Sequence, residues 1–451
     1  MGGRSGVLSS IGVFRNRPKQ LEEGPASGKG CRLLQAGAAG TVWNRSGGRR
    51  QIAAAAAVMS MLWASSSAMA AEWLVEPLLN LGLRYDDNIG LDPDNGEEVR
   101  AITVGAGAQF SRNTEVWRTQ ARALFSYVDY DNLRDRDQQL LELSSRYRAQ
   151  RHVLGLTASL RRDTTFTVRD DEAIEGVDVI IDPDATDGIE GPDLPDVGVA
   201  DVQIRRDRII LRPSWEYDLT RRTAIGLGYR LYDVSYDDEP GADLVDHTTH
   251  AVEGRFIYRL APNETISAVV EVARFEADER DAQTDNVSLL ATYDRAFSPV
   301  LRTSFSLGVR DSSVEEPGVD ESSTGVILRV GLTRELEAGR ISLRAGRDVR
   351  PSGVGEVVET DRVEADFARD LTPRLTFVMS GTAFKLRSVR DDGGGRADRD
   401  YFRIQPGLRY ALTRTMDIEA SYRYRWQDRE ADPGSAESNS IMLRLRYIGR
   451  L

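Results

Sequence analysis

Hydrophobic and polar residues alternate one by one along most of the chain after Trp73, and the segment from Thr415 to Gln427 shows this most completely. Its apolar residues are Met416, Ile418, Ala420, Tyr422, Tyr424 and Trp426, and between them stand Asp417, Glu419, Ser421, Arg423 and Arg425. A helix would scatter these charges around its surface, whereas a strand sorts them because successive side chains point to opposite faces. The pattern predicts a β-strand with one apolar and one charged face.

The same alternation recurs along the chain. Further apolar faces of this kind lie within 75–85, 102–110, 154–160, 209–217, 225–231, 287–293, 301–309, 326–332, 341–345, 402–410 and 441–447. The runs Leu140–Tyr147 and Arg374–Leu386 are less regular, with apolar residues on both faces. No composition shift marks a domain boundary after Trp73, so we expect one β domain.

Short and long connections follow one another between these strands. Arg112-Asn113-Thr114 and Leu371-Thr372-Pro373 are typical short turns. The long polar connections are Asp86–Glu97, Val168–Ala200, Asp237–Asp246, Asp311–Ser323, Asp391–Asp400 and Asp428–Asn439. Short turns on one side and long loops on the other are typical of a transmembrane antiparallel up-and-down β-barrel. The count of turns and loops favours 18 strands, with 16 as the alternative, and puts both termini on the short-turn side.

The chain shows no apolar run of about 20 residues after residue 71, so helical membrane spans are not expected. The mean hydropathy of −0.40 is compatible with a barrel, because a barrel strand presents only every second residue to lipid. Strands in lipid must close into a ring, since lipid cannot satisfy backbone N–H groups. Alternation alone leaves a soluble β-sandwich or propeller as an alternative.

A secretion signal precedes the strands. Arg49-Arg50 is followed by an apolar stretch from Ile52 to Trp63 and by Ala68-Met69-Ala70, which together match a cleavable signal peptide cut after Ala70. We therefore expect residues 1–70 to be an N-terminal extension plus signal, with its core at about 49–70, and residues 71–451 to be the barrel. Translation from a downstream start such as Val42, or a disordered extension, would explain residues 1–50.

Charge and cysteine content exclude several functions. The formal net charge is −12, and it becomes −19 without residues 1–70, which hold nine basic and two acidic residues. This balance argues against a nucleic-acid partner. The single cysteine, Cys31, lies before the expected cleavage point, so we expect no disulfide and no thiolate chemistry after it.

We expect no metal site, no cofactor and no enzymatic activity. Asp182-Pro183-Asp184 does not match the spacing of a calcium loop. His247 and His250 would fall on opposite faces of a strand, and no serine is held near either of them or near His152. A hydrolase would need a nucleophile and a base on one face.

Arginine dominates the face that a barrel would turn inward. The residues expected to line the lumen are Arg118, Arg122, Arg208, Arg212, Arg230, Arg302, Arg329, Arg344, Arg403, Arg409, Arg423, Arg425, Arg444 and Arg446. Many acidic residues fall in the expected outer loops, and residues 169–201 alone hold twelve. An arginine-lined lumen would favour anionic solutes. The alternative is that these arginines pair with carboxylates across strands.

Aromatic residues gather near the expected strand ends, where a barrel meets the lipid interface. The residues expected in this girdle are Trp73, Tyr127, Trp215, Tyr217, Tyr424 and Trp426.

Short motifs resemble a known family. Tyr85-Asp86-Asp87-Asn88-Ile89 is similar to the opening of the β-barrel porin type 2 family, and Asp218-Leu219-Thr220-Arg221-Arg222 and Asp370-Leu371-Thr372-Pro373-Arg374 resemble its turns. The resemblance would cover residues 71–451. It implies an outer-membrane barrel associated with exopolysaccharide secretion, working with separate periplasmic polysaccharide-export components. It supplies no catalytic residues.

The sequence thus predicts a porin-like pore or conduit in the outer membrane of a Gram-negative bacterium, reached by the general secretory route. The expected partners are outer-membrane lipid, lipopolysaccharide and the barrel-assembly machinery. A structural or adhesive barrel with a closed lumen and partner-binding loops is the alternative. The acidic segment Val168–Ala200 could fold inward against the arginines and constrict the pore.

Overall fold

The computed structural model describes residues 72–94, 96–165, 204–237, 244–277, 282–316, 319–351, 357–388, 398–429 and 434–449. The chain divides into two compact units, Met1–Ala68 and Met69–Leu451, and all described residues belong to the second. The expected signal, Cys31 and the acidic segment Val168–Ala200 lie outside the described residues. Within the described residues, no helix is long and apolar enough to cross a membrane.

The second unit consists of strands. They are β1 (Glu72–Asp86), β2 (Val99–Asn113), β3 (Trp117–Tyr130), β4 (Arg136–Arg148), β5 (His152–Thr165), β6 (Ile204–Asp218), β7 (Thr223–Tyr236), β8 (His247–Ala261), β9 (Glu264–Ala277), β10 (Ala282–Ser298), β11 (Leu301–Glu316), β12 (Val319–Leu336), β13 (Gly339–Pro351), β14 (Val357–Thr372), β15 (Leu375–Ser388), β16 (Arg399–Ala411), β17 (Met416–Arg429) and β18 (Ser435–Ile448).

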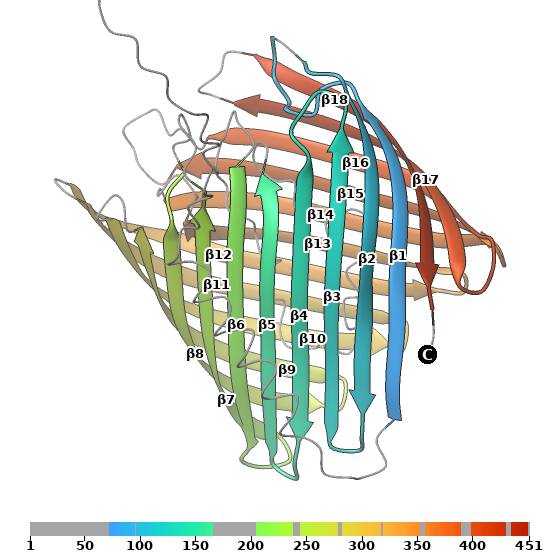
Figure 1. The fold of residues 1–451 in the computed structure, drawn as a ribbon. Coiled ribbons are helices and arrows are strands. Elements are labelled where there is room, and N and C mark those ends of the chain that lie inside the picture. The colour runs from blue at the N-terminus through green and yellow to red at the C-terminus, as the bar shows by residue number, and fades with distance from the viewer. Residues whose placement is uncertain are drawn as a thin grey trace, which may run out of the picture. The chain divides into compact units, whose positions relative to one another are not determined.

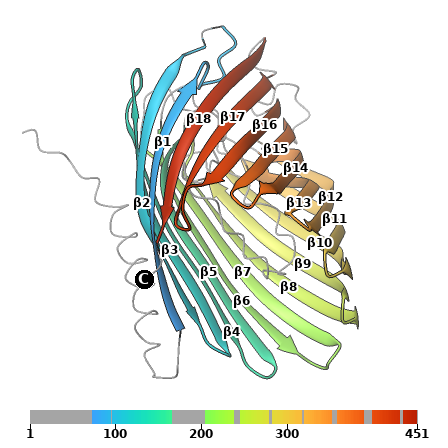
Figure 2. The same ribbon diagram turned by 90° about the vertical axis from the view of Figure 1, so that its right-hand side faces the viewer.

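The strands form one closed antiparallel barrel. Each strand pairs with its neighbours in sequence, and β1 pairs with β18 along Leu78–Asp86 and Ser440–Ile448. Figures 1 and 2 show the first and last strands lying side by side. Closure removes the free edges that an open sheet would leave. The predicted antiparallel barrel of 18 strands is confirmed.

The two ends of the barrel differ in their connections. At one end the turns are tight: the Thr114 N–H donates to the Trp117 carbonyl at 2.8 Å, and the Thr220 N–H donates to the Thr223 carbonyl at 3.1 Å. We call this the short-turn end and the opposite end the loop end. The sequence prediction of a long loop over Asp311–Ser323 is wrong, because β11 and β12 run on through most of this segment and pair as far as Glu316 and Val319.

The barrel exterior is apolar and its interior is polar. On β1, Leu79, Leu81 and Leu83 are 54%, 47% and 51% exposed, whereas the intervening Asn80 and Arg84 are buried. The strand register carries this alternation around the barrel, since Leu81 lies opposite Val104 on β2 and Leu445 on β18. An apolar outer face of this kind requires a non-aqueous surrounding.

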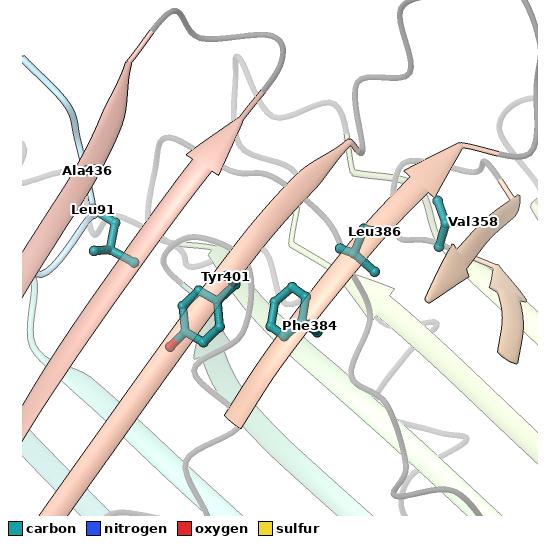
Figure 3. Close-up of a cluster of buried hydrophobic side chains, with 6 residues drawn as sticks. All are labelled: Leu91, Val358, Phe384, Leu386, Tyr401 and Ala436. Carbon is teal, nitrogen blue, oxygen red and sulfur yellow. The ribbon is translucent and has the colours of Figure 1, made fainter. Parts of the chain in front are cut away.

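The interior is packed at the loop end and loosely filled at the short-turn end. Along β3 the inward residues pass from the exposed Arg118 to the buried Arg122, Leu124, Val128 and Tyr130. Buried apolar clusters gather at the same level on other strands. Figure 3 shows the largest of them, formed by Leu91, Val358, Phe384, Leu386, Tyr401 and Ala436.

Candidate functional site

The strand register places the arginines that the sequence assigned to the lumen on the inward side of the barrel. These are Arg118, Arg122, Arg208, Arg212, Arg230, Arg302, Arg329, Arg344, Arg403, Arg409, Arg423, Arg425, Arg444 and Arg446. Further arginines on the same face are buried, among them Arg84, Arg206 and Arg399. The sequence reasoning missed them although they alternate with outward residues in the same way.

Asp86 is the centre of the first arginine cluster. Its carboxylate is fully buried and lies 2.7 Å from Arg84, 3.1 Å from Arg425 and 3.7 Å from Arg423, measured between charged atoms. The Ser438 hydroxyl donates to it at 2.8 Å. Among the described residues, one carboxylate therefore faces three guanidinium groups.

Asp163, near the loop end of β5, is the centre of a second cluster. Three arginines surround its buried carboxylate: Arg161 at 2.9 Å, Arg206 at 3.1 Å and Arg208 at 2.7 Å. Arg206 and Arg208 come from the neighbouring strand β6, because β5 and β6 pair with Asp163 opposite Arg206. In the described part of the chain, this cluster too holds three guanidinium groups around one carboxylate.

The third cluster lies toward the short-turn end of β16, β17 and β18. Arg409 is 2.9 Å from Glu419, and Arg444 and Arg446 lie 3.7 Å and 4.0 Å from the same carboxylate. Arg446 also contacts Asp417 at 2.9 Å. Here three guanidinium groups share two carboxylates.

Other inward arginines contact carboxylates of neighbouring strands. Their charged atoms are 3.7 Å apart in Arg122–Glu142, 3.1 Å in Arg230–Glu271 and 2.8 Å in Arg329–Asp348. Arg344 contacts two carboxylates, Glu364 at 3.0 Å and Asp366 at 3.1 Å. In this part of the wall, arginines pair with carboxylates across strands, which is the alternative raised from the sequence. Around Asp86, Asp163 and Glu419, in contrast, several arginines surround each carboxylate.

The segment that follows β1 is fastened to the last strand. The Asp87 N–H donates to the Asn439 carbonyl at 3.1 Å, and the Asn439 N–H donates to the Asp87 carboxylate at 2.6 Å. The Asn88 side-chain amide donates to the Glu437 carbonyl at 3.0 Å. The motif Tyr85-Asp86-Asp87-Asn88-Ile89 therefore stabilises the β1–β18 seam of the barrel at its loop end.

The aromatic residues assigned to the girdle all face outward, at two levels. Trp73, Trp215 and Tyr217 lie toward the short-turn end, and Tyr127, Tyr424 and Trp426 lie toward the loop end. The Trp215 and Tyr217 rings stack with centroids 6.1 Å apart. At the loop end, the Tyr127 hydroxyl donates to Asp135, and this bond holds the pKa of the Asp135 carboxyl below its usual range.

The histidines do not form a shared site. His247 is buried and faces inward beside Phe275, whereas His250 faces outward with its Nδ1 atom 2.8 Å from the Tyr229 hydroxyl. Within the described part of the chain, no group of three or more His, Cys, Asp and Glu side chains could hold a metal ion. Asp182-Pro183-Asp184 lies outside it.

The sequence matches no protein-family model and no curated protein. Solved structures with a similar arrangement include OccAB3 of Acinetobacter baumannii, at 12% identity and a TM-score of 0.41, covering 84% of this chain and 100% of that chain. OpdQ of Pseudomonas aeruginosa is 10% identical with a TM-score of 0.42 over 84% and 99% of the two chains. OccK2 (OpdF) of Pseudomonas aeruginosa, solved in complex with glucuronate, is 9% identical with a TM-score of 0.43 over 84% and 98%. The assignment of the fold rests on the strand pairing of this chain itself.

Proposed function

We propose that this chain is an outer-membrane pore that passes small anionic solutes. The observation that carries the proposal is that, among the described residues, guanidinium groups outnumber carboxylates around Asp86, Asp163 and Glu419. A barrel of this strand number is wide enough to hold an aqueous channel. Rings or walls of arginine in such a channel attract anions and repel cations.

Two of these clusters, around Asp86 and Glu419, lie on one wall of the barrel. Arg446 stands opposite Asp417, and Arg425 stands opposite Ser438, eight residues further along β17. At about 3.4 Å per residue this separation is about 27 Å along the strand. Arg423 lies between them. Positive charge therefore follows this wall over that distance, and its field favours anions in the lumen.

The proposal includes the place of the protein in the cell. The apolar exterior with aromatic residues at two levels supports insertion in the outer membrane of a Gram-negative bacterium, with lipid and lipopolysaccharide around it. Export by the general secretory route and folding by the barrel-assembly machinery follow from this placement. Residues 1–70 would supply the signal, cleaved after Ala70.

Ion selectivity tests the proposal. The purified barrel in a planar bilayer with a tenfold KCl gradient should give a reversal potential of the anion-selective sign, up to the limit of about 59 mV for a monovalent ion. Liposomes containing the protein should admit a uronic acid faster than the neutral hexose of the same size. A cation-selective reversal potential would overturn the proposal.

A charge variant and its control separate the lumen from the exterior. Arg409→Gln, Arg444→Gln and Arg446→Gln together should shift the reversal potential toward zero, because they remove the cluster around Glu419. Arg347→Gln is the control, since Arg347 faces outward and pairs with Asp361 at 2.6 Å on the exposed surface. It should leave the reversal potential unchanged.

Export of an exopolysaccharide is a narrower form of the proposal. It is supported by the motif beginning at Tyr85 and would require periplasmic polysaccharide-export components as partners. Deleting the gene should then abolish secreted glycan while the barrel alone still conducts ions. Unchanged glycan secretion would restrict the function to small solutes.

A barrel with a closed lumen is the second candidate, and the burial of inward residues at the loop end favours it. In this case the protein would be structural or adhesive, and its outer loops would bind a surface partner. It predicts no ion conduction in the bilayer although the protein is folded and inserted.

A further inference from the structure

We infer that the connection between β1 and β2, described at residues 87–94 and 96–98, is a built-in constriction in which Ile89 and Leu91 set the size limit for solutes. This inference rests on the proposed function as a pore. It concerns a different segment from Val168–Ala200, to which the sequence assigned a constriction. Three observations support this inference: the contacts of Leu91, the contacts of Ile89 and the hydrogen bonds of the segment.

Leu91 joins the β1–β2 connection to a distant part of the barrel wall. It is 3% exposed and packs in one cluster with Val358 of β14, Phe384 of β15 and Tyr401 of β16, as Figure 3 shows. The half-buried Leu244, from the connection between β7 and β8, packs against the same cluster. In the ring order, β7 and β8 lie about opposite β16. The cluster therefore bridges the loop-end mouth rather than covering one wall.

Ile89 fixes the other side of the segment. It is 1% exposed and packs with Val99, Val128 and Tyr130 on β2 and β3. Within three residues, the segment thus places one apolar side chain on the β2–β3 wall and the next on the β14–β16 wall. Side chains buried against both walls occupy space that would otherwise belong to the lumen.

Hydrogen bonds hold the segment in this place. The Arg425 guanidinium donates to the Asn88 and Ile89 carbonyls, each at 3.2 Å, and the Gln427 amide donates to the Leu91 carbonyl at 2.6 Å. The Asn88 side chain accepts from the Asp92 N–H at 3.0 Å and donates to the Asp92 carbonyl at 2.9 Å. Backbone groups that enter the lumen are therefore satisfied by the barrel wall.

The backbone at Leu91 has an unfavourable conformation for a leucine. Its φ is 51°, in the left-handed region that a glycine would adopt at lower energy. At the neighbouring Gly90, an added Cβ would have no atom within 4 Å, so a larger side chain would fit there. A leucine held at an unfavourable φ is consistent with a role for its buried side chain in closing the mouth.

The test compares single-channel conductance and the size cut-off for solutes in liposome swelling. Leu91→Gly removes the side chain and suits the backbone, so it should at least double the conductance and admit larger sugar acids. Ile89→Ala combined with Leu91→Gly should increase both further. Leu81→Ala is the matched control, because Leu81 lies on β1 but faces outward, and it should change neither value.

The outcomes separate the inference from the proposed function. If the unaltered barrel conducts and Leu91→Gly has the same conductance and cut-off, the inference is overturned and the pore remains. If neither protein conducts, the proposed function fails. Conduction only after Leu91→Gly would show that this segment closes the mouth. Heat-modifiable electrophoretic mobility shows whether each variant is folded. Gln427→Ala removes only the hydrogen bond to the Leu91 carbonyl and should give a conductance between those of the unaltered protein and Leu91→Gly. It replaces Leu91→Gly as the test if that variant does not fold.

Discussion

Replacing Asp86 by asparagine should destabilise the barrel more than any substitution of an exposed acidic residue. The change keeps the size of the side chain and removes the charge that three buried guanidinium groups share, those of Arg84, Arg423 and Arg425. It also weakens the attachment of β1 to β18 next to Ser438, which bonds to the same carboxylate. Three like charges would then remain buried together.

The structure sets the magnitude. Removing one partner of a buried ion pair costs about 3–5 kcal/mol, because the other charge stays desolvated. Asp86 is fully buried and its arginine partners are nearly so. The outward pair Arg347–Asp361 has a similar separation, 2.6 Å, but both side chains are more than 40% exposed. Exposed pairs of this kind contribute about 0–1 kcal/mol.

Urea unfolding in detergent micelles, followed by tryptophan fluorescence, measures the free energy of unfolding of the unaltered protein and of each variant. Asp86→Asn should lower the free energy of unfolding by about 3–5 kcal/mol, and the control Asp361→Asn should lower it by no more than about 1 kcal/mol. Equal effects of the two substitutions would refute the reasoning that the Asp86 cluster secures the seam of the barrel.

Three further predictions concern the wall and the leader. Leu81→Arg should reduce the stability of the barrel in lipid vesicles by about 2–4 kcal/mol, as expected for arginine facing the bilayer midplane, and an unchanged urea midpoint would contradict an outward-facing Leu81. Gly308→Ala should lower the free energy of unfolding by about 1–3 kcal/mol, because the added Cβ would lie 2.5 Å from the Leu289 carbonyl oxygen. The control Gly254→Ala, whose Cβ would have no atom within 4 Å, should leave the free energy of unfolding nearly unchanged in the same urea titration. N-terminal sequencing of the exported protein should begin at Ala71, and any other start would refute cleavage after Ala70.

Much of the wall could be predicted from sequence because strand periodicity is local. The alternation from Met416 to Trp426 assigns each side chain of β17 to one face, and the register with β18 keeps that assignment. The same reasoning failed at Asp311–Ser323. There the outward residues Asp311 and Ser313 are polar, so the apolar face ends before the strand does.

The contacts between distant segments could not be predicted in this way. Asp163 is 43 residues before its partner Arg206 and 45 before Arg208, and only the register of β5 on β6 brings them together. Likewise, the apolar residues Ile89 and Leu91 stand out in a polar connection, but no periodicity tells whether a connection turns outward or into the mouth. Burial in a cluster with Tyr401 settles that question.

The central claim is that apolar side chains face lipid and arginines face the lumen, and oxygen accessibility of spin labels along β17 tests it most directly. Single cysteines at positions 417 to 424, introduced with Cys31 replaced and labelled with a nitroxide in lipid vesicles, should show a period of two. Labels at Ile418, Ala420 and Tyr422 should have high accessibility to lipid-dissolved oxygen, and labels at Glu419, Ser421 and Arg423 should have low accessibility. A period near 3.6, or the opposite phase, would contradict the barrel described above.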